Sequence, residues 1–145
     1  MKKTLSFALC IILIISLCSC SLVRWHGDVS DVKIKKVRSE IYSQEDIDEA
    51  IGVILEDFKT WDGCKLTEIC YAGDEAVREE SGEYTGAGAL ERGYEADEMI
   101  ILLSTFETDG SDNNGSLNSD FTYDNWNWIL VRTAGGQWRH VDHGY

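Results

Sequence analysis

The clearest pattern of hydrophobic and polar positions lies in residues 43–58. Apolar residues recur there at intervals of three and four, so one face of a helix would be apolar and the other mainly acidic. Ser43 precedes Gln, Glu and Asp, which is a start resembling a capping box, with acids in the first turn. Gly63 is a natural stop. The pattern predicts a helix of about four turns that ends near residues 61–63.

Other stretches have the composition of β-strands. Residues 31–37 alternate apolar and basic positions, which predicts an edge strand, and residues 65–71 predict a second strand. Residues 99–106 are almost continuously apolar, which is typical of a central strand buried on both faces. The acidic, glycine-rich residues 74–98 predict either two short helices or an adaptable loop.

Residues 121–145 predict a β-hairpin around Gly135 and Gly136. A two-residue loop would set Arg132 opposite Arg139, and like charges facing each other are unfavourable. A three-residue loop, residues 134–136, instead sets Trp138 opposite Arg132, where a cation–π pair forms. In the preferred three-residue register one face carries Trp126, Trp128, Leu130, Arg132, Trp138, His140 and Asp142.

The order of these elements predicts an α+β fold. One long helix would pack across a curved antiparallel sheet of about four strands, cystatin-like or NTF2-like in outline. Residues 40–145 would form a single domain. Residues 20–39 would be an anchor and a basic tether that contains the edge strand.

The first residues predict export. Met1-Lys2-Lys3 is followed by an apolar run that ends at Leu17, too short to span a membrane comfortably. The segment ending Ser19-Cys20 resembles the bacterial lipoprotein signal, in which a small residue precedes the lipidated cysteine. We expect residues 1–19 to be a signal peptide and acyl chains such as palmitate on Cys20 to hold the domain on the outer face of the cell membrane. The alternatives are an uncleaved anchor and plain secretion.

The net charge of the chain limits the classes of partner that it could bind. The formal net charge is −13, and removal of the signal would make the protein more acidic because it takes away two lysines. Such a protein repels phosphate backbones, so nucleic acid is excluded as a partner. The expected partners are the lipid bilayer, through Cys20, and an envelope protein or a small ligand.

Cys64 and Cys70 are expected to be free thiols. If residues 65–69 between them lie in one strand, their Cα atoms are about 20 Å apart, too far for a disulfide. A bend at Gly63 would relax this objection.

The aromatic residues of the hairpin are candidates for a ligand pocket. Tyr123, Trp126, Trp128 and Trp138 combine large apolar surfaces with polar handles, and His140 and Asp142 lie beside them in sequence. The alternative is that these aromatic side chains form the core beneath the helix.

Two clusters are weak candidates for metal binding. His140 and His143, with Asp142 between them, could bind a transition metal, or His140 and Asp142 could act as base and orienting acid. The alternative is a His–Asp hydrogen bond that pins the last strand. Asp109, Ser111, Asn113 and Asp120 match positions 1, 3, 5 and 12 of a calcium loop, but a solvated loop is preferred. We therefore expect no metal and no cofactor.

Four segments resemble an uncharacterised extracytoplasmic family: residues 42–47, 71–75, 123–128 and 138–145. Members occur in Gram-positive lipoproteins and at the ends of membrane regulators of the penicillinase-sensor type. The resemblance implies a small α+β domain with a helix against an antiparallel sheet. It implies no established activity, so it assigns no functional residues.

These observations predict a membrane-anchored, non-enzymatic binding or protein-interaction module in the cell envelope. The sequence has no nucleophile elbow, P-loop, zincin helix or dinucleotide motif. One alternative is a small enzyme that uses His140 and Asp142 beside an aromatic pocket. Another is an accessory domain that acts through protein contacts alone.

Overall fold

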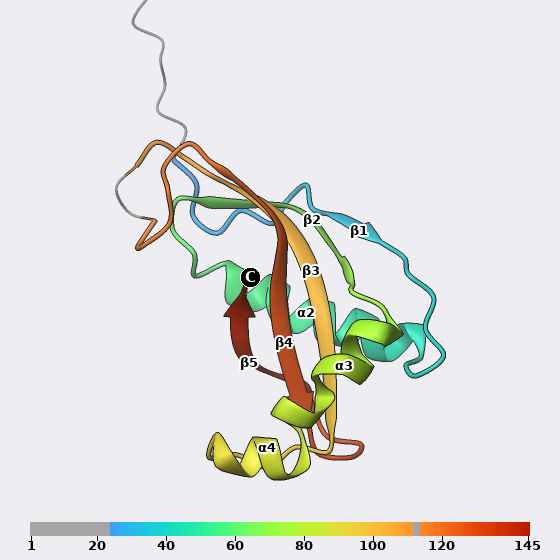
Figure 1. Cartoon of the computed structure of the whole chain (residues 1–145). Coiled ribbons are helices and arrows are strands. Elements are labelled where there is room, and N and C mark those ends of the chain that lie inside the picture. The colour runs from blue at the N-terminus through green and yellow to red at the C-terminus, as the bar shows by residue number, and fades with distance from the viewer. Residues whose placement is uncertain (1–23, 112–113) are drawn as a thin grey trace, which may run out of the picture.

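The computed structural model describes residues 24–111 and 114–145 (Figure 1). The expected signal peptide, residues 1–19, lies outside the described residues, as do Cys20 and Asn113. None of the helices within the described ranges is long and apolar enough to cross a membrane.

The long helix, α2, runs from Gln44 to Phe58, as residues 43–58 predict. Its capping box is complete: Ser43 Oγ accepts from the Asp46 backbone N–H at 3.1 Å, and Asp46 Oδ2 accepts from the Ser43 backbone N–H at 3.2 Å. These contacts satisfy two of the donors that a helix start leaves unpaired. The helix ends a few residues before the expected position.

Five strands form one sheet in the order β1-β2-β3-β4-β5. Their bounds are Lys33–Lys35, Cys64–Tyr71, Glu98–Thr108, Thr122–Arg132 and Arg139–Gly144. The strand β1 pairs with β2 in parallel, and the other pairs are antiparallel. The expected four-stranded antiparallel sheet is therefore corrected to a five-stranded mixed sheet. The cause is α2, which connects β1 to β2 as a crossover and so returns the chain in the same direction.

The glycine-rich segment forms two helices, α3 (Asp74–Tyr84) and α4 (Gly86–Glu91). The described residues therefore contain three helices rather than one. Gly88 permits the close packing of α4 on α3, because a Cβ there would lie 2.4 Å from the Gly82 carbonyl oxygen. Gly82 and Gly88, two of the glycines that suggested a loop, thus lie at the contact between these two helices.

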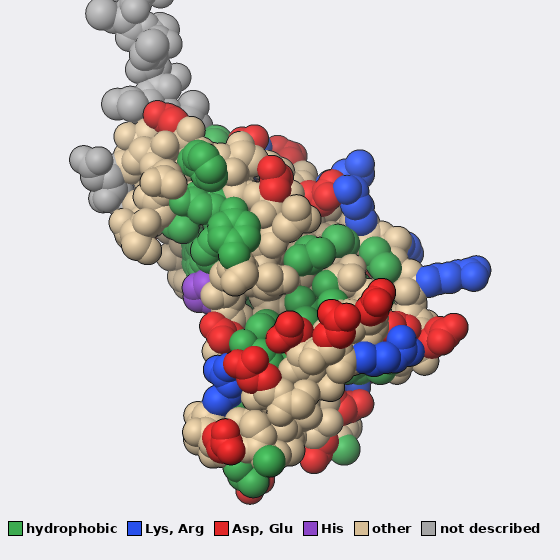
Figure 2. Space-filling model, in the orientation of Figure 1, with side chains coloured by type: hydrophobic (Ala, Val, Ile, Leu, Met, Phe, Trp, Pro, Cys, Tyr) green, Lys and Arg blue, Asp and Glu red, His purple; other side chains and the backbone are tan. Residues whose placement is uncertain are grey.

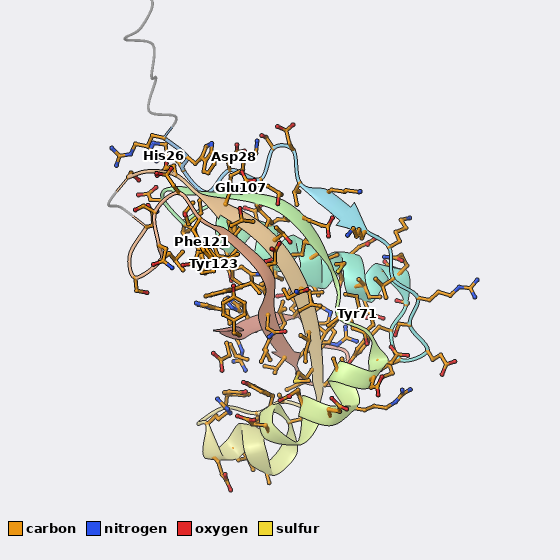
Figure 3. All side chains as sticks on the ribbon, turned by 45° about the horizontal axis from the view of Figure 1, so that its top comes forward. His26, Asp28, Tyr71, Glu107, Phe121 and Tyr123 are labelled. Atoms are coloured by element: carbon orange, nitrogen blue, oxygen red, sulfur yellow. The ribbon has the colours of Figure 1, made fainter. Side chains whose placement is uncertain are left out.

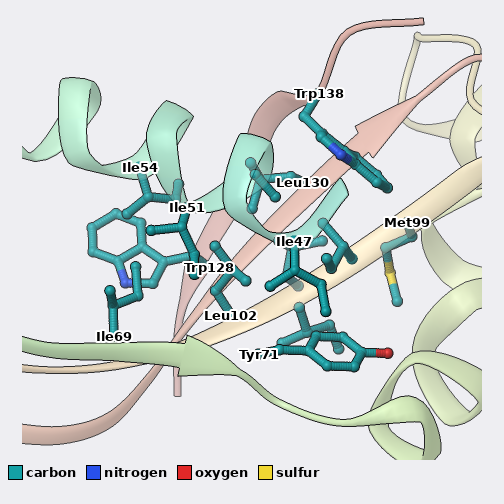
Figure 4. Packing of buried hydrophobic residues seen from close by; sticks show 14 of the residues in the cluster. Ile47, Ile51, Ile54, Ile69, Tyr71, Met99, Leu102, Trp128, Leu130 and Trp138 are labelled. Atoms are coloured by element: carbon teal, nitrogen blue, oxygen red, sulfur yellow. The ribbon is translucent and has the colours of Figure 1, made fainter. Parts of the chain in front are cut away.

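Different helices pack on the two faces of the sheet. The helix α2 packs on one face, where Ile47, Ile51 and Ile54 meet Leu102 and Trp128 (Figure 4). The helix α3 lies across the lower part of the opposite face (Figure 1). The main core therefore lies between α2 and the sheet, and much of the opposite face is open.

The hairpin β4–β5 confirms the three-residue loop. Val131 pairs with Arg139 and Leu130 with His140, which is the register that residues 134–136 require. The Arg132 guanidinium lies 4.1 Å from the centre of the Trp138 ring, as predicted. Gly135 has φ +69°, a conformation that favours glycine.

The segment expected as a tether is docked on the domain from Trp25 onward. The Trp25 backbone N–H donates to Asp109 Oδ2 at 2.8 Å, and its carbonyl accepts from the Gly63 N–H at 2.9 Å. Gly27 has φ +55°, and a Cβ there would lie 2.3 Å from the Phe58 carbonyl oxygen. This close contact explains why the segment packs against the end of α2 instead of extending into solvent.

Candidate functional site

Aromatic rings gather where α2 ends. Phe58 stacks on Trp61 with ring centres 5.5 Å apart, and Trp61 lies 4.9 Å from Trp128 of β4. Further rings come from the sheet and from β5. We call the whole set the aromatic cluster: Phe58, Trp61, Phe106, Tyr123, Trp126, Trp128, His140, His143 and Tyr145.

The aromatic cluster runs from the core to the surface. Trp128 has no exposed surface, Tyr123 is buried, Trp61 and Trp126 are half-buried, and Tyr145 is 78% exposed. The buried indole of Trp128 is satisfied, because its Nε1–H donates to Ser104 Oγ at 2.8 Å. The cluster is therefore a continuation of the core that reaches solvent at one end.

The residues predicted for a pocket do not all meet. Trp138 lies away from the aromatic cluster, edge-on to Tyr42 with ring centres 5.6 Å apart, and is 5% exposed. Trp128 and Trp138 are therefore core residues, which is the alternative to a ligand pocket. Trp126 instead borders open space. Trp61 was not among the predicted pocket residues, because this residue follows the helix and shares no periodicity with the hairpin.

A β-bulge separates the side chains of His140 and Asp142. Leu130 pairs with His140, but its neighbour Ile129 pairs with Asp142, so Val141 is the extra residue of β5. The expectation that His140 and Asp142 share a face is wrong. The Asp142 carboxylate lies on the α3 side, where it accepts from the Tyr84 hydroxyl at 2.9 Å.

The bulge instead brings the two histidines together on the α2 side. His140 Nδ1 lies 2.9 Å from Asp57 Oδ2, and His140 Nε2 lies 3.3 Å from His143 Nδ1. His140 Nε2 is also 3.1 Å from the Asp142 carbonyl oxygen. A pair of imidazoles with a carboxylate behind one of them is thus the most polar part of the aromatic cluster.

His143 is surrounded by indole rings. Its ring centre lies 5.1 Å from Trp61, 5.4 Å from Trp128 and 6.0 Å from Trp126. Partial burial lowers the pKa of His143, and electrostatic repulsion from the neighbouring His140 lowers it further. The surroundings therefore favour the neutral imidazole, which is the form that accepts a hydrogen bond or binds a metal.

An open groove of about 480 Å³ borders the aromatic cluster. Its apolar side is formed by Trp61, Trp126, His143 and Leu117, and Asp62 is among its polar residues. Its other lining residues are Thr60, Cys64, Asn114, Gly115 and Ser116. We call this space the indole groove. It combines flat ring faces with hydroxyl and carboxylate groups.

A second cavity, of about 360 Å³, lies on the α3 side. It is bordered by Glu79, Glu80 and Asp142 above apolar residues that include Ile101 and Ile129. Acidic side chains also gather over α3 in Figure 2, whereas hydrophobic side chains gather toward the end where the described chain begins. The two open spaces therefore differ in charge.

Phe121 and Tyr123 mark the end of the sheet that carries the indole groove. Figure 3 labels them at the same end of the molecule as His26 and Asp28 of the docked N-terminal segment. The Phe121 and Tyr123 ring centres are 4.9 Å apart, and Phe121 is 47% exposed. This end of the molecule thus exposes more aromatic surface than the end near α4.

The loop that was compared with a calcium site begins at Asp109, whose carboxylate accepts hydrogen bonds from protein groups. Asp109 Oδ2 accepts from the Trp25 N–H, and Asp109 Oδ1 accepts from the N–H and hydroxyl of Ser111. Burial alone would raise the pKa of Asp109, but these hydrogen bonds more than offset it and lower the pKa. Among residues 24–111 and 114–145, no three His, Cys, Asp or Glu side chains are grouped as a metal site. Asp120 lies near Gly110 in this loop.

Cys64 and Cys70 are free thiols, as predicted. Burial raises the pKa of Cys64 to about 11, and the carboxylates of Asp109 and Asp62 add to the effect. The thiolate is therefore scarce at neutral pH, and Cys64 is not suited to nucleophilic chemistry.

No family model, curated protein or solved structure matches this chain. The resemblance to the extracytoplasmic family of Gram-positive lipoproteins stays a prediction.

Proposed function

We propose that this protein is a lipid-anchored module of the cell envelope that binds a glycan in the indole groove. The observation that carries the proposal is the pair of half-buried indoles, Trp61 and Trp126, that line an open groove of about 480 Å³. The apolar C–H face of a sugar ring packs on an aromatic face, and its hydroxyls bond to polar side chains such as Asp62.

The size and openness of the groove fit this ligand class. Ligand sites of this kind have volumes of about 300–1,000 Å³ and combine apolar walls with a few polar groups. Thr60, Asp62 and Ser116 add oxygen atoms to the lining of the groove. A groove that is open to solvent accepts an internal segment of a polymer as well as its end.

The geometry does not favour the alternative of a small enzyme that uses His140 and Asp142. The bulge at Val141 sends these two side chains to opposite faces of the sheet. The Asp142 carboxylate is engaged by Tyr84, and it lies beside the cavity on the α3 side. A base and its orienting acid must be within hydrogen-bond reach of each other.

We propose further that acylated Cys20 holds the domain on the outer face of the cell membrane. Because Trp25 is docked, only residues 21–24 link it to Cys20, and five extended Cα steps reach about 17 Å. The described chain enters the domain at the same end as residues 109–121 (Figure 1). The indole groove would then lie close to the membrane surface.

The finer description of the fold, cystatin-like or NTF2-like, is part of the same proposal. It is supported by α2 packing across a curved sheet, and the membership of the extracytoplasmic family is supported by the four sequence segments alone. Accessory action through protein contacts stays the second possibility of the non-enzymatic class.

The test is binding of soluble wall glycan fragments to the full chain in mild detergent, measured by calorimetry. Trp126→Ala is expected to raise the dissociation constant about tenfold, which corresponds to about 1.4 kcal/mol. Tyr94→Ala is the control, because Tyr94 is also half-buried but lies outside the groove. Equal binding by the two variants, or no binding by the unmodified protein, would contradict the proposal.

A further inference from the structure

His140 Nε2 faces two polar atoms, the Asp142 carbonyl oxygen and His143 Nδ1. Asp57 Oδ2 lies 2.9 Å from His140 Nδ1, and a carboxylate can only accept, so Nδ1 carries a proton. In the neutral ring Nε2 then has a lone pair. It faces the Asp142 carbonyl oxygen at 3.1 Å, and His143 Nδ1 lies 3.3 Å away. The oxygen can only accept, so three arrangements suit Nε2: a proton on Nε2, an N–H donated to it by His143 Nδ1, or a metal ion bound by both rings.

The spacing of the two ring nitrogens fits a shared metal ion. Nitrogen atoms bound to tetrahedral zinc at about 2.0–2.1 Å lie about 3.3–3.4 Å from each other. His140 Nε2 and His143 Nδ1 are 3.3 Å apart.

Asp57 supplies the outer contact that metal-binding histidines commonly have. A ligand histidine usually donates its second ring N–H to a carboxylate, which fixes the tautomer and makes the ligand nitrogen more basic. Asp57 Oδ2 holds His140 in this way from the last turn of α2. The β5 bulge aims both imidazoles at the same side of the sheet, so the helix and the strand build the arrangement together.

We propose that His140 Nε2 and His143 Nδ1 bind a divalent transition-metal ion of the zinc type, with Asp57 as the positioning residue. The Asp142 carbonyl oxygen is close enough to be an additional ligand. Imidazole nitrogen is a preferred ligand of such ions, and water completes the coordination. His143 borders the indole groove, so the ion is reachable from solvent. This site does not depend on glycan binding.

Two side-chain ligands make a moderately tight site, so the test measures Zn²⁺ binding directly. The full chain is titrated with Zn²⁺ alone by calorimetry, and the bound metal is counted after dialysis. One Zn²⁺ per chain is expected. His143→Ala should weaken binding at least tenfold, and Asp57→Asn should weaken it about 10–100-fold while it leaves both ligands in place.

His26→Ala is the matched control. His26 also lies 3.0 Å from an aspartate, Asp62, but it has no second imidazole beside it, and its side chain is 65% exposed. This variant should bind Zn²⁺ as the unmodified protein does. A melting curve for each variant without metal separates loss of the site from loss of the fold.

Three results would overturn the proposal. The first is the absence of saturable Zn²⁺ binding, and the second is binding that His143→Ala leaves unchanged. The third is an equal loss in His26→Ala and His143→Ala, because this would assign the metal to scattered surface groups. Weak binding that is the same in every variant would belong to the acidic surface and would count with the second.

Discussion

The two ends of α2 each carry tryptophan and charged residues, but they are built differently. At the start of the helix, Arg132 bonds to Asp46 at 2.8 Å and to Glu98 at 2.6 Å, and it lies over Trp138. Its side chain is only 10% exposed. At the other end, Trp61 and Trp126 border the open indole groove. The first end is closed by mutual pairing, and the second is left open.

The difference separates what holds the fold from what is available to a partner. At the closed end each charged group has a partner within the domain, so a change there should lower stability. At the open end Trp61 and Trp126 are only half-buried, so a change there should alter binding more than stability. The following predictions test this contrast, from the largest expected effect to the smallest.

Trp128, the fully buried tryptophan of the aromatic cluster, should contribute most to stability. Trp128→Ala removes a side chain with no exposed surface and leaves Ser104 without its partner, so we expect a loss of about 3–5 kcal/mol in the free energy of unfolding. Trp126→Ala, at the half-buried position two residues earlier, should cost less than half of that. Urea unfolding measures both. Equal losses would show that Trp126 is a core residue and not part of an open site.

Removal of the charge at the closed end should have the next largest effect. Arg132→Met keeps most of the length of the side chain but leaves Asp46 and Glu98 without their shared cation. We expect a loss of about 2 kcal/mol, between the values for surface and buried ion pairs, because the partners are about a third exposed. Unfolding in urea at low and high salt checks it. A loss under about 0.5 kcal/mol would mean that the closed end is not held by these pairs.

Low pH should reduce the stability that the closed end of α2 contributes to the fold. Hydrogen bonds from Ser43 and Arg132 lower the pKa of Asp46 below its ordinary value of 3.8. A carboxyl group with a lowered native pKa contributes stability that is present above its unfolded pKa and is lost as the pH falls through its native pKa. Stability should therefore fall below about pH 4, and Asp46→Asn should make this fall less steep. An unchanged acid transition in the variant would refute the assignment.

Mild acid should have a smaller effect at the open end. Burial and electrostatic repulsion from His140 lower the pKa of His143 below 6.5. The unfolded chain then binds the proton more tightly, so stability decreases as the pH falls below about 6.5. His143→Gln should reduce this decrease, which melting curves from pH 7.5 to pH 5 can follow. A larger decrease in the variant would show that His143 is favoured in its charged form.

Local patterns predicted most of the elements. The periodicity of residues 43–58 and the serine at their start gave α2, and the repulsion expected between Arg132 and Arg139 gave the hairpin loop. The helix and the hairpin loop are both determined by residues that are close in sequence. The parallel pairing of β1 and the helices α3 and α4 were missed or left open, because they depend on contacts between distant segments.

The candidate site was predicted only in part, for a similar reason. The sequence pointed to Trp126, His140 and His143, which do lie in the aromatic cluster. The bulge at Val141 has no marker in the sequence, yet it decides that His140 faces Asp57 and that Asp142 faces Tyr84. Periodicity assigns a face to each strand position only until an extra residue shifts it.

The most direct test of the open end uses the indole N–H signals of the five tryptophans. Each signal is assigned by single Trp→Phe variants, and a wall glycan fragment is titrated into the labelled full chain while NMR spectra are recorded. If the indole groove is the binding site, the signals of Trp61 and Trp126 shift with ligand concentration, and that of Trp138 at the closed end stays in place. No shift at Trp61 and Trp126, or an equal shift at Trp138, would contradict the account.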